Sequence, residues 1–306
     1  MPQTENAPLR LPPELRRPRS ARQLSEVKAL LRRSRLVTVC EEARCPNIGE
    51  CFSRKTATFM ILGDTCTRRC HFCNVKTGRP GEPDVDEPRA LAEAAASLGL
   101  DHVVITSVDR DELEDCGADH WAACIRAVKD RLPSAEVEIL TPDFKGRPEL
   151  IDRVLAAGPS VFNHNIETVS RLYRKVRPQS RWETTCEVLR YVATSGHPAV
   201  KSGLMVGLGE TDDEVLETLR TLRELGVHIV TIGQYMRPTL RHWEVDRYVD
   251  EARYERYREY GEELGFTHVF AGPFVRSSYH AKEAAFAHRS HDAAHKGSAR
   301  RLTVLS

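Results

Sequence analysis

Short apolar runs alternate with amphipathic stretches along most of the chain. Each run has the length of a β-strand, and apolar residues at helical spacing follow it. The expected strands are residues 58–63, 102–106, 137–140, 161–162, 200–206 and 228–232. The expected helices are residues 89–98, 119–132, 148–157, 181–194, 213–225 and 251–264. This alternation predicts an α/β fold with a parallel sheet.

Two architectures fit six strand–helix units. One is a partial (β/α)6 barrel and the other is a doubly wound open sheet, and the period of the apolar residues does not separate them. In both, chemically active side chains are expected at the carboxyl ends of the strands. The predicted divisions are a basic N-terminal arm (1–36), a cysteine segment (37–57), the barrel (58–265), a C-terminal segment (266–281) and a mobile tail (282–306).

Composition and charge are ordinary for a globular protein. Of the 306 residues, 41% are hydrophobic and 29% are charged, and the formal net charge is +1. This charge gives no reason to expect nucleic-acid binding. No run approaches the ~18–20 apolar residues that a membrane helix needs, and residues 1–22 lack the apolar core of a secretory signal. We therefore expect a cytoplasmic protein with no nucleic-acid or membrane partner.

The nine cysteines change this picture because six of them form two triplets between Cys40 and Cys73. Without a secretory signal, clustered cysteines indicate metal or redox ligands rather than disulfides. The other three are interpreted as small buried hydrophobic residues: Cys116, Cys124 and Cys186.

The second triplet directly follows the first predicted strand. Cys66, Cys70 and Cys73 have the spacing C-x3-C-x2-C, with the aromatic Phe72 before the last cysteine. Three thiolates on a four-iron cluster would leave one iron open, as a catalytic metal requires. A zinc knuckle or an electron-transfer cluster is the alternative. The neighbouring arginines, Arg68 and Arg69, are expected to be solvated or to face a helix.

This triplet resembles the signature of the radical SAM superfamily. The segment Gly203-Leu-Met-Val-Gly207-Leu-Gly-Glu210 is similar to that family's Gly-rich segment at the fifth strand. The resemblance implies a 4Fe–4S cluster whose open iron binds S-adenosylmethionine. It also implies the partial barrel, with an N-terminal cluster-binding extension and a C-terminal segment that closes on it.

The first triplet, Cys40, Cys45 and Cys51, has the spacing C-x4-C-x5-C and lacks a fourth ligand. Far along the chain stands Gly272-Pro-Phe-Val-Arg-Ser-Ser-Tyr279. Together the two motifs resemble those of the lipoyl synthase family. The resemblance implies that Ser278 is the fourth ligand of a second, auxiliary 4Fe–4S cluster, with Ser277 the weaker alternative.

The resemblance also implies a reaction. Two sulfur atoms from the auxiliary cluster would be inserted at C6 and C8 of an octanoyl chain, which is amide-linked to a lysine of a carrier protein. The implied partners are the lipoyl domains of 2-oxoacid dehydrogenase complexes, the glycine-cleavage H protein and an electron donor. Two rival interpretations remain open at this point: another radical SAM sulfur-insertion enzyme, and a non-catalytic iron–sulfur electron carrier.

The resemblance of the Arg-Ser-Ser-Tyr segment makes Ser278 and Arg276 the catalytic candidates. Further site residues are predicted from their places near strand ends. The candidates for binding S-adenosylmethionine are Asn163, Glu167, Lys201 and Glu210, and Arg177 has the same standing.

Residues 10–35 carry nine Lys or Arg against two Glu, which indicates either a solvated surface or a docking patch for an acidic lipoyl domain. Cys116 stands where the family has glycine, so the turn there is expected to differ.

Overall fold

The structure is a computed structural model. It describes residues 12–15, 28–29, 31–34, 36–43, 45, 47–53, 58–196, 198–278 and 281. Most of the predicted basic arm and the whole of the predicted tail lie outside these residues, so the expectations for both segments stay predictions.

A mostly parallel sheet of eight strands forms the centre of the described chain. Its order is β1-β2-β5-β6-β7-β8-β9-β10. All neighbours are parallel except β1, which is antiparallel to β2. Because the strand order follows the chain without a reversal, the doubly wound alternative is excluded. The strands are β1 (Val37–Thr38), β2 (Thr58–Ile61), β5 (His102–Ser107), β6 (Glu136–Leu140), β7 (Val161–Asn163), β8 (Ala199–Val206), β9 (Ile229–Gln234) and β10 (His268–Gly272), with a separate pair, β3 (Thr65–Cys66) and β4 (Lys76–Thr77).

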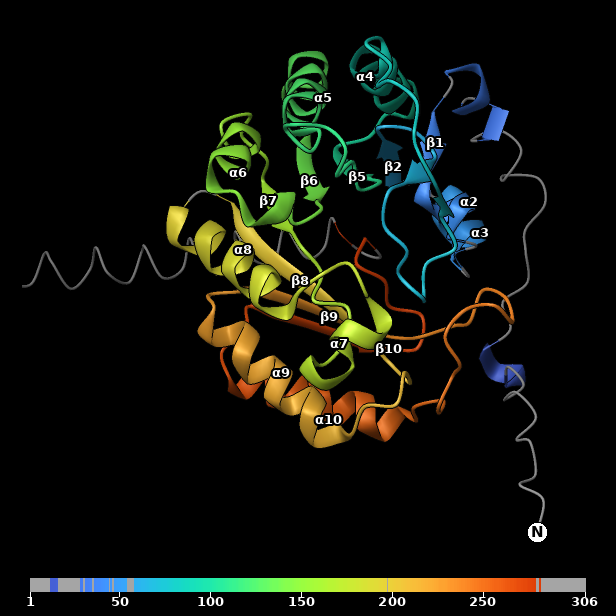
Figure 1. Cartoon of the computed structure of the whole chain (residues 1–306), viewed down its shortest axis with the longest axis vertical. Helices are drawn as coiled ribbons and strands as arrows, with labels where there is room; N and C mark the ends of the chain where they lie inside the picture. The colour runs from blue at the N-terminus through green and yellow to red at the C-terminus, as the bar shows by residue number, and fades with distance from the viewer. Residues whose placement is uncertain are drawn as a thin grey trace, which may run out of the picture.

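Helices cover the outer face of this curved sheet (Figure 1). None in the described part of the chain is long and apolar enough to cross a membrane. The helices between strands are α4 (Glu87–Leu98), α5 (Ala118–Arg131), α6 (Pro148–Leu155), α7 (Ser170–Val176), α8 (Trp182–Ser195), α9 (Asp212–Glu224) and α10 (Glu251–Glu263). Shorter helical segments are η1 (Pro13–Leu15), α2 (Val39–Glu42), α3 (Ile48–Ser53) and η2 (Phe144–Gly146).

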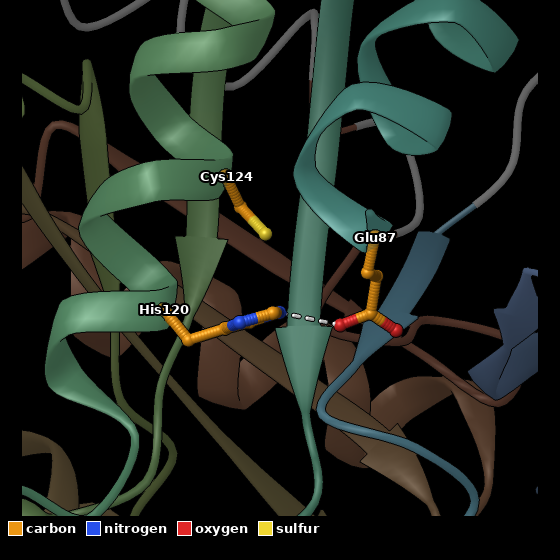
Figure 2. A group of neighbouring side chains, drawn as sticks. All are labelled: Glu87, His120 and Cys124. Carbon is orange, nitrogen blue, oxygen red and sulfur yellow. Dashed lines mark hydrogen bonds and ion pairs between the residues drawn. The ribbon is translucent and has the colours of Figure 1, made fainter. Parts of the chain in front are cut away.

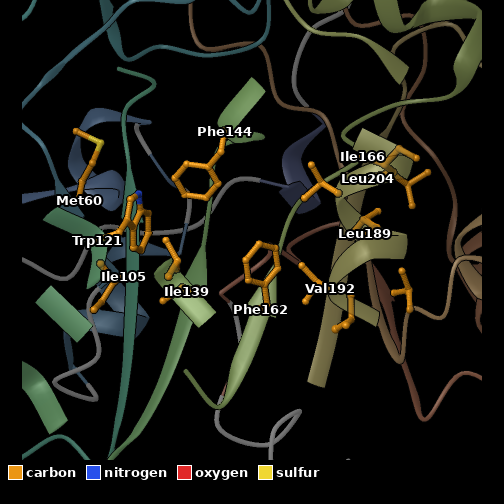
Figure 3. Close-up of a cluster of buried hydrophobic side chains, with 14 of the residues drawn as sticks. Met60, Ile105, Trp121, Ile139, Phe144, Phe162, Ile166, Leu189, Val192 and Leu204 are labelled. Atoms are coloured by element: carbon orange, nitrogen blue, oxygen red, sulfur yellow. The ribbon is translucent and has the colours of Figure 1, made fainter. Parts of the chain in front are cut away.

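The main hydrophobic core lies between the strands and these helices (Figure 3). Ile105, Ile139 and Phe162 project from neighbouring strands, and Trp121 and Leu189 project from helices; all five are fully buried. Burial of each such side chain contributes about 1.5–3 kcal/mol. The strands are also covered on their inner face, which explains why the sequence presents them as nearly continuous apolar runs.

The inner face of the barrel holds a buried ion pair. Lys201 Nζ donates to Glu138 Oε1 at 2.8 Å, and both side chains are fully buried. His102 Nε2 lies 3.4 Å from the second carboxylate oxygen. Burial alone would raise the pKa of Glu138, but the Lys201 ammonium and His102 lower that pKa below its ordinary value. The pair therefore stays charged inside the barrel.

Two local features bear on the sequence-based expectations. Strand β10 was not predicted: it lies at the edge of the sheet, and three of its five residues are only partly buried. Cys116 adopts the left-handed conformation (φ 51°), and Gly117 after it does the same (φ 83°). The turn thus has a positive φ at a non-glycine residue, at a cost of about 1–2 kcal/mol. Cys116, Cys124 and Cys186 are all buried, as expected.

Replacement of Lys201 by Met is expected to lower the free energy of unfolding by about 3–5 kcal/mol, because it leaves the Glu138 carboxylate buried without its cation. Anaerobic urea unfolding followed by tryptophan fluorescence measures the change. The double variant Lys201→Met, Glu138→Leu removes both charges and should recover most of the loss. A single variant as stable as the parent would contradict the structural role of the pair.

Candidate functional site

The second cysteine triplet lies at the carboxyl end of β2, on the rim of the barrel. Leu62 and Gly63, which follow the strand, have positive φ values of 67° and 92°. This conformation turns the chain away from the sheet. Cys66 then lies in β3, and Cys70 and Cys73 lie in the loop that returns to β4.

The three thiols are close enough to affect one another's ionisation. Burial raises the pKa of both Cys66 and Cys73 to about 12, and the nearby Cys70 adds to the shift. The backbone N–H groups of Arg68 and Asp109 donate to Cys66 Sγ over 3.4 and 3.3 Å. Thiols that ionise poorly by themselves lose their protons when a metal ion takes the protons' place. The donor set therefore fits a thiolate-bound metal cluster.

Arg68 fixes this loop to the ends of β5 and β6. Its guanidinium makes two hydrogen bonds to Asp111, of 2.7 and 2.8 Å, and two to Asp143, of 2.6 and 2.7 Å. Burial alone would raise the pKa of Asp143, but Arg68 lowers it to about 2. The expectation that Arg68 is solvated or faces a helix is wrong, because its partners are acidic residues distant in sequence. Arg69 has an exposed side chain.

A second charged group gathers beyond β7 and next to Cys70. Glu167 has a left-handed backbone (φ 67°), and backbone hydrogen bonds hold it against β8. Asn165 Nδ2 donates to Glu167 Oε1 at 3.1 Å. Burial raises the pKa of Glu167, and the Arg177 guanidinium opposes that rise. Burial likewise raises the pKa of Cys70, and Arg177 again lowers it. Arg177 is therefore near both the Glu167 carboxylate and Cys70.

The other predicted binding residues lie in different surroundings. Asn163 ends β7 and is fully buried, and neither atom of its amide has a hydrogen-bond partner among the described residues. Lys201 is paired with Glu138 inside the barrel. The Glu210 carboxylate accepts from the backbone N–H groups of Gly207 (2.7 Å) and Leu208 (2.8 Å), so it closes the Gly-rich turn.

The first triplet lies beside β1 and β2. Cys40 is in α2 and Cys51 is in α3, with Cys45 between the two helices. Burial raises the pKa of Cys40 to about 12; the nearby Cys45 and Cys51 contribute, and hydrogen bonds from Thr58 oppose the shift. These effects indicate that the three cysteines lie near one another around the start of β2.

The C-terminal segment returns to this first triplet. Thr58 Oγ1, whose residue lowers the pKa of Cys40, donates to Ser278 Oγ at 2.8 Å. Asn47 Nδ2, in the triplet segment, donates to the backbone carbonyl of Phe274 at 2.7 Å. These contacts bring the C-terminal segment next to the segment that carries the first triplet.

Ser277 has a different partner from its neighbour. Its Oγ accepts a 2.7 Å hydrogen bond from Asn165, in the group around Glu167. A Cβ on Gly203 would lie 3.2 Å from Ser277 Oγ, and a Cβ on Gly233 would lie 2.2 Å from the Val275 carbonyl oxygen. Glycine at these two strand positions is thus what allows the C-terminal segment to approach β8 and β9.

Arg276, the residue before the two serines, folds back onto its own segment. Its Nη1 donates to the carbonyl oxygens of Val275 (2.6 Å) and Pro273 (3.3 Å), which bends the side chain back over its own segment. Burial lowers the pKa of Arg276, whereas Cys45 and Tyr254 raise it. The guanidinium is therefore near Cys45.

Sequence reasoning did not single out Thr58, Asn165 or Asp109, although each contacts a predicted site residue. Thr58 begins β2, and Asp109 and Asn165 come shortly after β5 and β7, so their places at strand ends were the usable signal.

Comparisons with known proteins identify the family of the chain. A profile described as the Radical SAM superfamily matches residues 60–222. Lipoyl synthase from Rubrobacter xylanophilus is 56% identical over 260 residues, which cover 84% of this chain and 81% of that protein. Lipoyl synthase from Methylococcus capsulatus is 55% identical over 282 residues, covering 91% and 88%.

Solved structures support the fold. The chain resembles methylornithine synthase with a TM-score of 0.53 and 14% identity, over 84% of this chain and 80% of that one. It resembles the FeFe-hydrogenase maturase HydG from Carboxydothermus hydrogenoformans with a TM-score of 0.54 and 14% identity, over 86% and 77%. With the partial barrel, the two triplets and relatives of such high identity, the chain belongs to the lipoyl synthase family of the radical SAM superfamily.

Proposed function

We propose that the chain holds two 4Fe–4S clusters with different tasks. As a lipoyl synthase, the chain is a radical SAM enzyme that transfers sulfur. Cys66, Cys70 and Cys73 would hold the cluster that binds S-adenosylmethionine. The auxiliary cluster would be held by the first triplet and Ser278.

The hydrogen bond between Thr58 and Ser278 carries the proposal for the auxiliary cluster. Three thiols near one another need a fourth donor. Thr58, which influences the pKa of Cys40, donates its hydroxyl hydrogen to Ser278 Oγ. Ser277 is hydrogen-bonded to Asn165 instead. An alkoxide oxygen is a harder donor than a thiolate, so a bond from serine to iron exchanges more readily than one from cysteine. Such a bond suits a cluster that is opened during turnover.

The proposed reaction divides between the two sites. Cys66, Cys70 and Cys73 would hold a cluster able to supply the electron that cleaves S-adenosylmethionine. Cys40, Cys45, Cys51 and Ser278 would hold a cluster able to supply sulfide for C6 and C8 of the octanoyl chain. The octanoyl group would arrive on a lysine of a lipoyl domain of a 2-oxoacid dehydrogenase complex or of the glycine-cleavage H protein. An electron donor completes the set of partners.

The chain's own residues would bind and orient the small molecules. Glu167 and Asn165 offer hydrogen-bond acceptors for sugar hydroxyls, and Arg177 offers a cation beside Cys70. Asn163 presents an unpartnered buried amide at the end of β7. The opposite end of the interior is filled by an apolar group of Val161, Ala199, Ile229 and Phe270, together with the Lys201–Glu138 pair. This filling keeps water from the interior during radical chemistry.

The Ser278→Ala variant is expected to lose sulfur insertion by about 100-fold or more, because loss of even an outer partner of a metal site costs about 10–100-fold. Formation of 5′-deoxyadenosine should persist, since the second triplet is unchanged. Mass spectrometry of an octanoyl-lysine peptide measures sulfur insertion, and iron analysis should fall toward the content of a single cluster. Ser277→Ala is the matched control. Equal losses in both serine variants would contradict the assignment of Ser278.

The Glu167→Gln variant is expected to raise the Kd for S-adenosylmethionine about 10–100-fold, because a hydrogen bond to a charged group contributes about 1.5–3 kcal/mol. Anaerobic equilibrium dialysis with labelled S-adenosylmethionine gives the Kd, with iron content as a check on the clusters. Glu210→Gln is the control, since backbone N–H groups occupy both of its carboxylate oxygens. That variant should lose thermal stability and keep its Kd. The assignment of Glu167 fails if the two variants weaken binding equally.

A further inference from the structure

Three side chains of metal-binding type converge at a place outside both cysteine triplets. Glu87 is the first residue of α4, and His120 and Cys124 lie on α5. Their potential ligand atoms all lie within 4.8 Å of one another. His120 Nε2 is 2.6 Å from Glu87 Oε2. Figure 2 shows the three side chains pointing into the space between the two helices.

The local structure explains this convergence. His120 and Cys124 are four residues apart, so both project from the same face of α5. Glu87 comes from the neighbouring helix, and its carboxylate also accepts from the backbone N–H of Leu62 at 2.8 Å. These constraints leave the three side chains little freedom to separate.

The donor set matches one kind of ion. A carboxylate, an imidazole and a thiol are the three ligand classes that Zn²⁺ takes in proteins. Zinc bond lengths place neighbouring ligands of a tetrahedral site about 3.3–3.8 Å apart. In the structure, His120 Nε2 and Glu87 Oε2 are 2.6 Å apart, and no two of the three ligand atoms are more than 4.8 Å apart. Small side-chain movements would therefore suffice to bring all three atoms to the distances of a zinc site.

The three groups differ in burial. The side chains of Glu87 and His120 are 10% and 12% exposed, whereas Cys124 is fully buried. Solvent can therefore reach the group only on the side of Glu87 and His120. Three protein ligands with water at the fourth position is a common zinc arrangement.

We propose that Glu87, His120 and Cys124 bind a Zn²⁺ ion. On binding, the thiol proton of Cys124 passes to solvent, and the hydrogen between His120 Nε2 and Glu87 moves to Nδ1 or to solvent. No electron is transferred, because zinc has no redox chemistry at such sites.

The ion would brace the base of the loop that carries the second triplet. Leu62, which donates to Glu87, stands four residues before Cys66. Arg110 Nη1 donates to the Leu62 carbonyl oxygen at 3.0 Å. A metal at Glu87 would therefore connect α4 and α5 to the point where β2 turns toward the cysteines. Its role would be structural and would not involve substrate.

The test uses the full chain with both clusters reconstituted, dialysed anaerobically against low micromolar ZnCl₂. We expect one additional zinc per chain by plasma mass spectrometry, in the parent and in the control Cys186→Ala. The zinc affinity of Cys124→Ala and of His120→Asn should fall by about 100-fold or more, since even outer partners contribute about 10–100-fold. Iron content shows whether the variants retain their clusters.

X-ray absorption at the zinc edge, recorded on the parent protein alone, keeps the test decisive if a variant does not fold. One sulfur at about 2.3 Å with nitrogen and oxygen at about 2.0–2.2 Å supports the site. A shell made mainly of sulfur would place the zinc in a cysteine triplet and overturn the proposal. Equal zinc uptake by the parent and Cys124→Ala, or no uptake by the parent, would also overturn it.

Discussion

The arrangement of the reactive rim depends on the buried guanidinium of Arg68. The loop that carries the second triplet is only partly packed against the core, through Cys66, Phe72 and Val75. Arg68 supplies the missing constraint, because its planar group makes paired hydrogen bonds to Asp111 and Asp143 at the ends of two strands. Asp109, which follows β5 as Asp111 does, donates its backbone N–H to Cys66 Sγ. The loop conformation is thus set by the sheet.

The second constraint is the return of the C-terminal segment to the start of β2. The sheet is open in the described chain, with β1 and β10 at its two edges, so segments that adjoin these edges can meet across the opening between them. Thr58 and Ser278 meet there although they are 220 residues apart. Because the closure joins both ends of the barrel, the first triplet and the serine come together only in the folded chain.

Much of the fold could be predicted from the sequence. The apolar runs placed β5, β6 and β9 within about two residues of their ends, because strands buried on both faces consist mainly of apolar residues. The edge strand β10 was not predicted, because it lies at the edge of the sheet and is buried less completely than the inner strands. The partners of Arg68 and Lys201 could not be predicted either. Asp111 and Asp143 lie 43 and 75 residues from Arg68, and Glu138 lies 63 residues from Lys201. No local sequence pattern encodes such pairings.

Two glutamates show where site prediction from sequence stops. Glu167 and Glu210 both follow strands, and both are carboxylates beside a predicted binding site, so they were equal candidates before the structure was known. Their backbone contacts separate them. Glu210 satisfies two N–H groups of its own turn, whereas Glu167 is held in a strained left-handed conformation next to Arg177. Strain of about 1–3 kcal/mol persists only where the surrounding structure enforces it. A carboxylate oriented at such a cost, beside a cation and a cysteine triplet, is better placed to bind a ligand than one that is already fully bonded.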